Sequence, residues 1–284
     1  MKRLSFFVVL LVIATGAFAQ FVQSNTMQNN NSASTNFGNP FSKMTTDNYG
    51  RLYIGYNPIS VDWEEDESDL KDTFPMNHGL TLGYMQASNI AKSLPLYVEY
   101  GANFAWTFGK YDDKESEDDY SWKRENNLNM FSINVPVNLA FRFSFNNNNF
   151  SVTPYLGLNF RLNVAGTCKM TTSIEEEDDD GETYTETQIV KYKLFSSDET
   201  DLGDEDNWDF DEGEYEATAE ASTGMGERAF KRFQVGFNVG VAVSYKKLHL
   251  GIGYVADFNK LVNYEDEDFI CKLGVPTISL GITF

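Results

Sequence analysis

The sequence predicts an all-β protein, an eight-stranded antiparallel up-and-down β-barrel that crosses a membrane. Three observations predict this fold. Eight stretches alternate apolar and polar residues, several of them exceed ordinary strand length, and nearly all carboxylates lie outside them. Alternation with a period of two gives a strand one apolar and one polar face. The expected strands are residues 51–58, 80–85, 96–108, 131–143, 151–164, 233–245, 248–258 and 276–284.

Each strand is identified by apolar residues that recur at every second position. In chain order these are Leu52, Ile54 and Tyr56; Leu80, Leu82 and Tyr84; Val98, Tyr100 and Phe104; Ile133, Val135 and Val137; Leu156, Leu158 and Phe160; Val235, Phe237 and Val239; Leu248, Leu250 and Ile252; and Ile278, Leu280 and Ile282. The intervening positions are mostly Gly, Asn, Ser and Thr, with few charges. Such a composition favours a crowded polar interior over a water-facing sheet.

The length of the strands favours a membrane over a soluble sandwich. Segment 151–164 keeps its alternation throughout, with Arg161 on the polar face far from either end. Strands of globular proteins average about 5–6 residues, whereas a tilted strand needs about 9–11 residues to cross a bilayer. Because no backbone group can stay unpaired in lipid, the sheet must close into a barrel.

The distribution of charge supports the same conclusion. Of the 42 Asp and Glu residues, 39 lie in four segments, 60–77, 109–127, 167–231 and 259–270. The other three are Asp47, Glu99 and Asp257. Strands that face hydrocarbon must avoid carboxylates, because charge at bilayer depth is costly. The four acidic segments alternate with short turns, as the extracellular loops of bacterial outer-membrane barrels do. Loop 167–231 is expected to form a hairpin at Asp180-Gly181 above the membrane.

The N-terminal region predicts export. Met1-Lys2-Arg3, an apolar stretch and Ala17-Phe18-Ala19 are typical of a secretory signal peptide over residues 1–19. Residues 20–48 are rich in Asn and Ser and are expected to be a flexible leader before a barrel of residues 49–284. The net charge of −20 argues against nucleic acid as a partner.

Three stretches resemble a known family: "FSINVPVNLAFRF" (131–143), "VTPYLGLNF" (152–160) and "GFNVGVAVSYKKLHLGIGYVADF" (236–258). They resemble the small outer-membrane β-barrel proteins of the Bacteroidota, the PorT-like group within the broader OmpA-like eight-stranded barrels. The final "ISLGITF" looks like the C-terminal signal read by the barrel assembly machinery. The resemblance implies an outer-membrane location, contact with lipid and lipopolysaccharide, and a role in an envelope export apparatus with a protein partner.

The inward face carries the charges that the strands retain. The expected polar network of the lumen is Glu99, Arg142, Arg161, His249 and Asp257. An unpaired charge there costs several kcal/mol, so Glu99 is expected to pair with Arg142 or Arg161. Side chains nearly fill an eight-stranded barrel. A plugged polar core is therefore favoured over a narrow gated pore.

An enzymatic role is less well supported. An envelope hydrolase would have to use His78 at the rim, near loop carboxylates such as Asp72, or His249 in the lumen. No spacing in the sequence fixes a catalytic geometry around either histidine. No cofactor is expected. Glu176, Asp178 and Asp180 are weak candidates for loose calcium binding, because an EF-hand read from Glu176 would place Thr187 where its bidentate glutamate belongs. Cys168 and Cys271 either form a disulfide or remain two thiols.

These observations favour a non-enzymatic outer-membrane protein. Its barrel would be an anchor, and its acidic loops would serve adhesion, cation capture or partner binding. The open alternatives are a component of an export apparatus, a narrow pore, an envelope hydrolase and a soluble periplasmic barrel that carries a ligand.

Overall fold

The computed structural model describes residues 46–63, 75–91, 94–117, 120–145, 149–177, 183–195, 213–218, 230–261 and 271–284. Residues from Thr45 to Phe284 form one compact unit. The expected signal peptide (1–19), and the expected leader up to residue 45, lie outside the described residues. The described residues include no helix with the length and hydropathy needed to cross a membrane.

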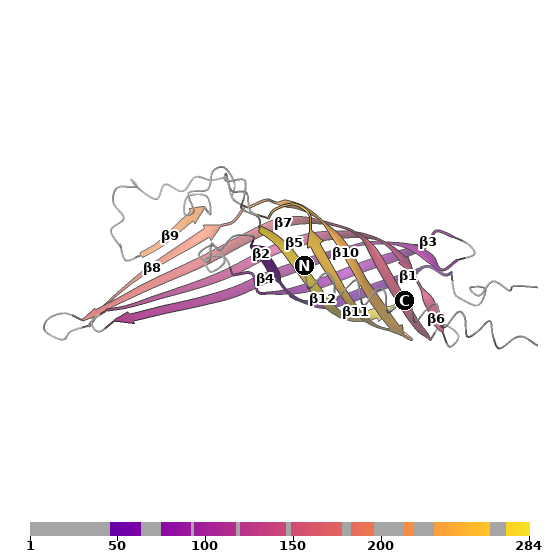
Figure 1. The fold of residues 1–284 in the computed structure, drawn as a ribbon, viewed down its shortest axis with the longest axis horizontal. Coiled ribbons are helices and arrows are strands. Elements are labelled where there is room, and N and C mark those ends of the chain that lie inside the picture. Colours follow the sequence, from indigo (N-terminus) through magenta and orange to yellow (C-terminus); the bar gives the residue numbers. More distant parts are fainter. Residues whose placement is uncertain are drawn as a thin grey trace, which may run out of the picture. The chain divides into compact units, whose positions relative to one another are not determined.

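Eight strands pair in sequence order and close into a ring (Figure 1). They are β1 (Tyr49–Pro58), β3 (His78–Asn89), β4 (Leu96–Glu117), β5 (Tyr120–Phe141), β7 (Phe150–Glu177), β10 (Phe233–Tyr245), β11 (Leu248–Asp257) and β12 (Cys271–Thr283). Each pairs antiparallel with the next, and β12 pairs with β1 to complete the ring. The predicted eight-stranded antiparallel barrel is therefore confirmed.

The outward face of this ring is an apolar belt. Large apolar side chains are exposed on all eight strands, among them Ile54, Leu82, Phe104, Val135, Leu156, Phe237, Ile252 and Leu280. Ile54 is 63% exposed and Leu280 is 60% exposed, and the two are register partners. A continuous apolar surface of this extent is stable against lipid and unstable against water. The barrel is a transmembrane one on this physical ground.

The long acidic segments differ from the expected loops. Strand β4 continues to Glu117 and β5 begins at Tyr120, so most of segment 109–127 is a β-hairpin. Strand β7 continues to Glu177 and pairs with β8 (Thr183–Lys193). Figure 1 shows β4, β5, β7 and β8 running on together beyond the ring. The expectation of a loop over 109–127 was wrong, because strand pairing between β4 and β5 continues above the belt. The hairpin expected within 167–231 is present as β7 and β8.

Three shorter strands complete the sheet. Strand β2 (Ser60–Trp63) pairs with β12, β6 (Phe143–Phe145) pairs with β7, and β9 (Gly213–Thr218) pairs parallel with β8. The register of Glu177 with Thr183 places the tip of the β7–β8 hairpin around the expected position, although Asp180 and Gly181 lie outside the described residues.

A register shift separates the barrel from the extension. On β5 the shift falls between Phe131 and Ser132, whose partners on β7 are Ala165 and Asn163. The extra residue on β7 is Val164, as in a β-bulge. Even-numbered β7 residues face outward before it, and odd-numbered ones face outward after it. Strand β10 pairs with β7 as far as Leu162, and β8 takes the same edge from Thr167 onward. The bulge thus lies where the closed ring becomes an open sheet.

Candidate functional site

Glu99 lies at the short-turn end of the lumen and is fully buried. Its Oε1 accepts a hydrogen bond from the hydroxyl of Tyr49 at 2.5 Å and forms an ion pair with Arg51. The expected pairing of Glu99 with Arg142 or Arg161 was wrong. Arg51 lies on β1, which only β3 separates from β4, and its guanidinium forms the ion pair with Glu99.

Arg142 follows the last residue of β5 and is half-buried. Its guanidinium carbon lies 4.4 Å from the centre of the Tyr49 ring, a cation–π distance. The Tyr49 ring is also 5.1 Å from the Tyr97 ring. Tyr49, Tyr97 and two alanines, with Tyr155 beside them, form a small apolar cluster that covers the short-turn end of the lumen.

Arg161 and Asp257 form a second buried ion pair, nearer the long-loop end. Arg161 Nη1 lies 2.9 Å from Asp257 Oδ2. The Nε of Arg161 donates to Asn134 Oδ1 at 3.1 Å, and its Nη1 donates to Gln234 Oε1 at 3.4 Å. The Arg161 charge is therefore shared among three acceptors, whereas the Arg51–Glu99 pair depends mainly on one carboxylate.

Amides join the two ion-pair levels. Asn134 donates to Asn103 at 2.8 Å, Asn103 donates to the Tyr53 hydroxyl at 3.4 Å, and Asn238 donates to Asn138 at 3.0 Å. These side chains leave a cavity of about 110 Å³, also lined by Arg51, Glu99 and His249. Space of this size can hold a few small molecules such as water.

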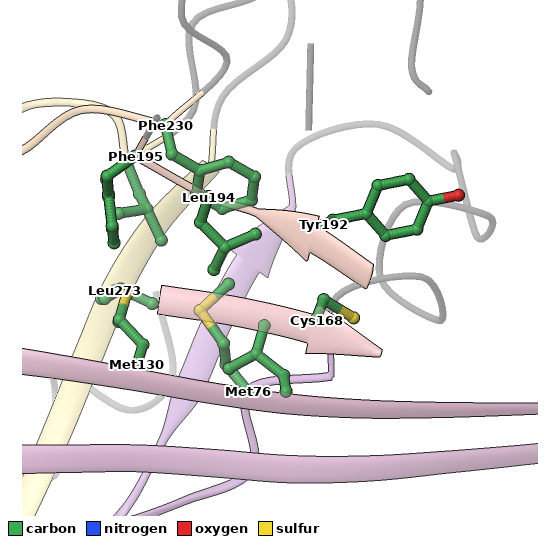
Figure 2. Packing of buried hydrophobic residues seen from close by; sticks show 10 residues of the cluster. Met76, Met130, Cys168, Tyr192, Leu194, Phe195, Phe230 and Leu273 are labelled. Carbon is green, nitrogen blue, oxygen red and sulfur yellow. The ribbon is translucent and has the colours of Figure 1, made fainter. Parts of the chain in front are cut away.

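A hydrophobic stopper borders this cavity at the long-loop end (Figure 2). The stopper consists of Met76, Leu128, Met130, Cys168, Tyr192, Leu194, Phe195, Phe230, Leu261 and Leu273. Met130 and Leu273 also line the cavity, so the two features are continuous. Figure 2 shows Leu194, Phe195 and Phe230 gathered on one side of the stopper, and the two phenylalanine rings meet edge to face at 6.2 Å.

Arg232 fastens the stopper to the barrel. Its Nη1 donates to the carbonyl of Val164 at 3.1 Å, and its Nη2 donates to the carbonyl of Phe195 at 2.5 Å. The guanidinium carbon also lies 5.7 Å from the centre of the Phe195 ring. The backbone N–H of Leu194 donates to Gly166 at 3.0 Å. The stopper is thus held to β7 at the position where β10 gives way to β8.

The two histidines lie in different surroundings. His78 is at the exposed rim, where its Nδ1 shares a 2.7 Å hydrogen bond with the Tyr56 hydroxyl and its ring lies 5.8 Å from that of Phe108. His249 is buried in the lumen with its ring 6.3 Å from that of Tyr53. Asp72, the carboxylate considered beside His78, lies outside the described residues.

Ion pairs on the β4–β5 extension are exposed. Lys110 Nζ lies 2.8 Å from Asp112 and 3.6 Å from Glu125, and Lys123 also pairs with Glu125. The hydrogen bond from Lys123, with the charge of Lys110 nearby, lowers the pKa of Glu125 below its usual value. Such pairs orient the side chains and add little stability.

The cysteine and metal predictions are partly outside the described residues. Cys168 is buried in the stopper, while the side chain of Cys271 is not among those described, so their disulfide stays a prediction. Asp178 and Asp180 lie outside the described residues, and Glu176 is the register partner of Tyr120 on β5. No cluster of three or more metal-binding side chains occurs in the part of the chain that the structure describes.

Sequence reasoning placed Glu99, Arg161, His249 and Asp257 in the lumen, where the structure has them buried. It missed Arg51 as the partner of Glu99, although the position of Arg51 on the polar face of the first strand makes it a candidate for the lumen. It also missed the stopper, because its residues come from segments without a regular period.

No protein-family model matches this chain, and no curated protein sequence matches it. Solved structures resemble it. The attachment invasion locus protein Ail of Yersinia pestis, in complex with the heparin analogue sucrose octasulfate, has 15% identity and a TM-score of 0.35, over 84% of this chain and 99% of that one. Neisserial surface protein A has 12% identity and a TM-score of 0.33, over 84% and 97%. A major outer membrane protein from Thermus thermophilus has 13% identity and a TM-score of 0.29, over 84% and 100%.

Proposed function

We propose that this protein is a non-enzymatic barrel of the bacterial outer membrane that serves as an anchor and displays its long-loop end outside the cell. The observation that carries the proposal is the closure of the lumen. The stopper covers the long-loop end, the Tyr49–Tyr97 cluster covers the other, and two buried ion pairs with their amides occupy the space between. A barrel whose lumen is filled in this way is better suited to anchoring an extracellular surface than to conducting ions.

The displayed surface is then the working part of the molecule. Strands β4, β5, β7 and β8 continue well beyond the apolar belt and hold the acidic segments on an ordered sheet. A stiff sheet presents side chains to a partner at a lower entropic cost than a flexible loop does. We infer that this surface binds a cationic partner and, through its dense carboxylates, divalent cations such as calcium with weak affinity.

Planar-bilayer recording tests the closed lumen. The purified protein is expected to insert without measurable conductance, while a variant with Phe195→Ala and Phe230→Ala, which thins the stopper, serves as the comparison. Steady channel currents from the unaltered protein would contradict the anchor proposal and favour a pore.

Proteolysis of intact cells tests the orientation. Added protease should cut within 109–127 or 167–231 and leave the barrel strands as a protected core. If these segments are cleaved only after the outer membrane is ruptured, the long-loop end faces inward and the proposal fails.

A further inference from the structure

Three polar atoms of the lumen are buried without a hydrogen-bond partner among the described residues. They are Glu99 Oε2, Arg51 Nε and His249 Nδ1. Their residues are each 5% exposed or less, and all three line the cavity of about 110 Å³. A buried polar atom without a partner is destabilising, and most such atoms in folded proteins are bonded to protein or to ordered water. The three atoms therefore indicate a ligand in the cavity.

The Arg51–Glu99 ion pair leaves one side of each group unused. Glu99 Oε1 accepts hydrogen bonds from the Tyr49 hydroxyl and from Arg51 Nη2, whereas Glu99 Oε2 accepts none from the described residues. Glu99 Oε2 thus needs a donor, and Arg51 Nε needs an acceptor. His249 Nδ1 takes either role, according to its tautomer. A ligand that serves all three atoms must both donate and accept hydrogen bonds.

The charges of the lumen argue against an ion as this ligand. Arg51 pairs with Glu99, and Arg161 pairs with Asp257, so the charges of the two pairs cancel. A further cation in the cavity would lie near the Arg51 guanidinium, and a further anion would lie near the Glu99 carboxylate. Either ion would also lose its hydration on entry. A neutral molecule avoids both costs.

The size and the lining of the cavity fit water. A water molecule occupies about 30 Å³ in the liquid, so the cavity accepts about three or four of them. The amides of Asn103, Asn134 and Asn138 line the same space and supply further hydrogen-bonding groups. Buried waters make about three hydrogen bonds each, and a polar lining of this kind provides them. Met130 and Leu273 of the stopper border the cavity and separate such waters from the long-loop end.

We propose that the cavity binds a cluster of water that bridges Glu99 Oε2, Arg51 Nε and His249 Nδ1. The cluster completes the hydrogen bonds of the Arg51–Glu99 pair and links that pair to β11. The core of the barrel is then built from side chains and water together, so apolar atoms placed in the cavity remove stability and do not add it. The inference goes beyond the proposed function, since it holds whichever end of the barrel faces outward.

Magnetic relaxation dispersion of labelled water oxygen tests the cluster, because it counts waters that stay in a protein for longer than the particle tumbles. The sample is the full-length mature protein in detergent micelles. The filling variant is Ala105→Leu, at a residue that lines the cavity, and the matched control is Ala102→Leu, exposed on the outward face of the same strand. The unaltered protein and the control should hold long-lived waters, and the filling variant should lose most of them. Absence of long-lived water from the unaltered protein, or an equal count in all three proteins, would overturn the proposal.

Denaturant unfolding separates the loss of water from simple crowding. Ala105→Leu should lower the midpoint denaturant concentration of the otherwise unaltered protein, because three buried polar atoms lose their partners. In a protein that also carries Arg51→Met and Glu99→Leu, two of those atoms are gone, so the same change should lower the midpoint much less or raise it. Crowding alone would lower the midpoint equally in both proteins. That result, or a higher midpoint for Ala105→Leu alone, would contradict the water cluster.

Discussion

The buried Arg51–Glu99 pair allows a sharp test of how the lumen is held together. The change is Glu99→Gln, which keeps the shape of the side chain and removes its charge. Glu99 is fully buried and Arg51 is 4% exposed, so the guanidinium loses its counter-ion inside the lumen, away from bulk water. Removal of one partner from a buried ion pair costs about 3–5 kcal/mol, and we expect a loss of that size in the free energy of unfolding.

The companion substitutions separate charge from packing. Arg51→Met combined with Glu99→Leu removes both charges, and the double variant should recover most of the loss because no uncompensated charge remains. Asp257→Asn should cost less than Glu99→Gln, because Arg161 keeps Asn134 and Gln234 as acceptors. Asp112→Asn, in an exposed pair on the extension, serves as the control and should leave stability unchanged.

The assay is denaturant unfolding of the protein in detergent micelles, followed by tryptophan fluorescence and by heat-modifiable gel mobility as a check of barrel closure. The reasoning is refuted if Glu99→Gln changes the free energy of unfolding by less than about 1 kcal/mol, the size of an ordinary hydrogen bond. It is also refuted if the double variant is less stable than the single one, since the lumen would then need the ions themselves.

Three further outcomes are expected. Leu280→Arg places a charge on a side chain that is 60% exposed in the belt, so folding into vesicles should weaken by about 2–4 kcal/mol, whereas a barrel surrounded by water would tolerate it. Gly240→Ala directs a methyl group at the Tyr155 hydroxyl and to 2.5 Å from the carbonyl of Ile252, so it should destabilise the barrel by about 1–3 kcal/mol. Gly55→Ala is its control, with the nearest atom 3.3 Å away, and an equal loss in both would contradict the packing argument. If Cys168 and Cys271 pair, reductant should change the gel mobility of the unheated protein, and a Cys271→Ser variant should show no such change.

The alternation of apolar and polar residues is local information, and it was sufficient to predict the barrel fold. Alternation over segments such as 131–143 and 233–245 depends on side chains two positions apart, so the faces, the belt and the eight strands follow from reading along the chain. The same parity placed Glu99 and Arg161 inside. Hydrocarbon excludes carboxylates so strongly that the charge distribution alone marked the segments outside the membrane.

Contacts between side chains on different strands are not local, so the sequence alone was insufficient to predict them. Whether Glu99 meets Arg51 or Arg142 depends on the register around the closed ring, where a shift of two residues exchanges one neighbour for another on the same face. The hairpins above the belt form because their strands continue a sheet that the barrel has already aligned. The stopper joins Met76, Phe195, Phe230 and Leu261 from four separate segments, and only the closed barrel brings these side chains to one place.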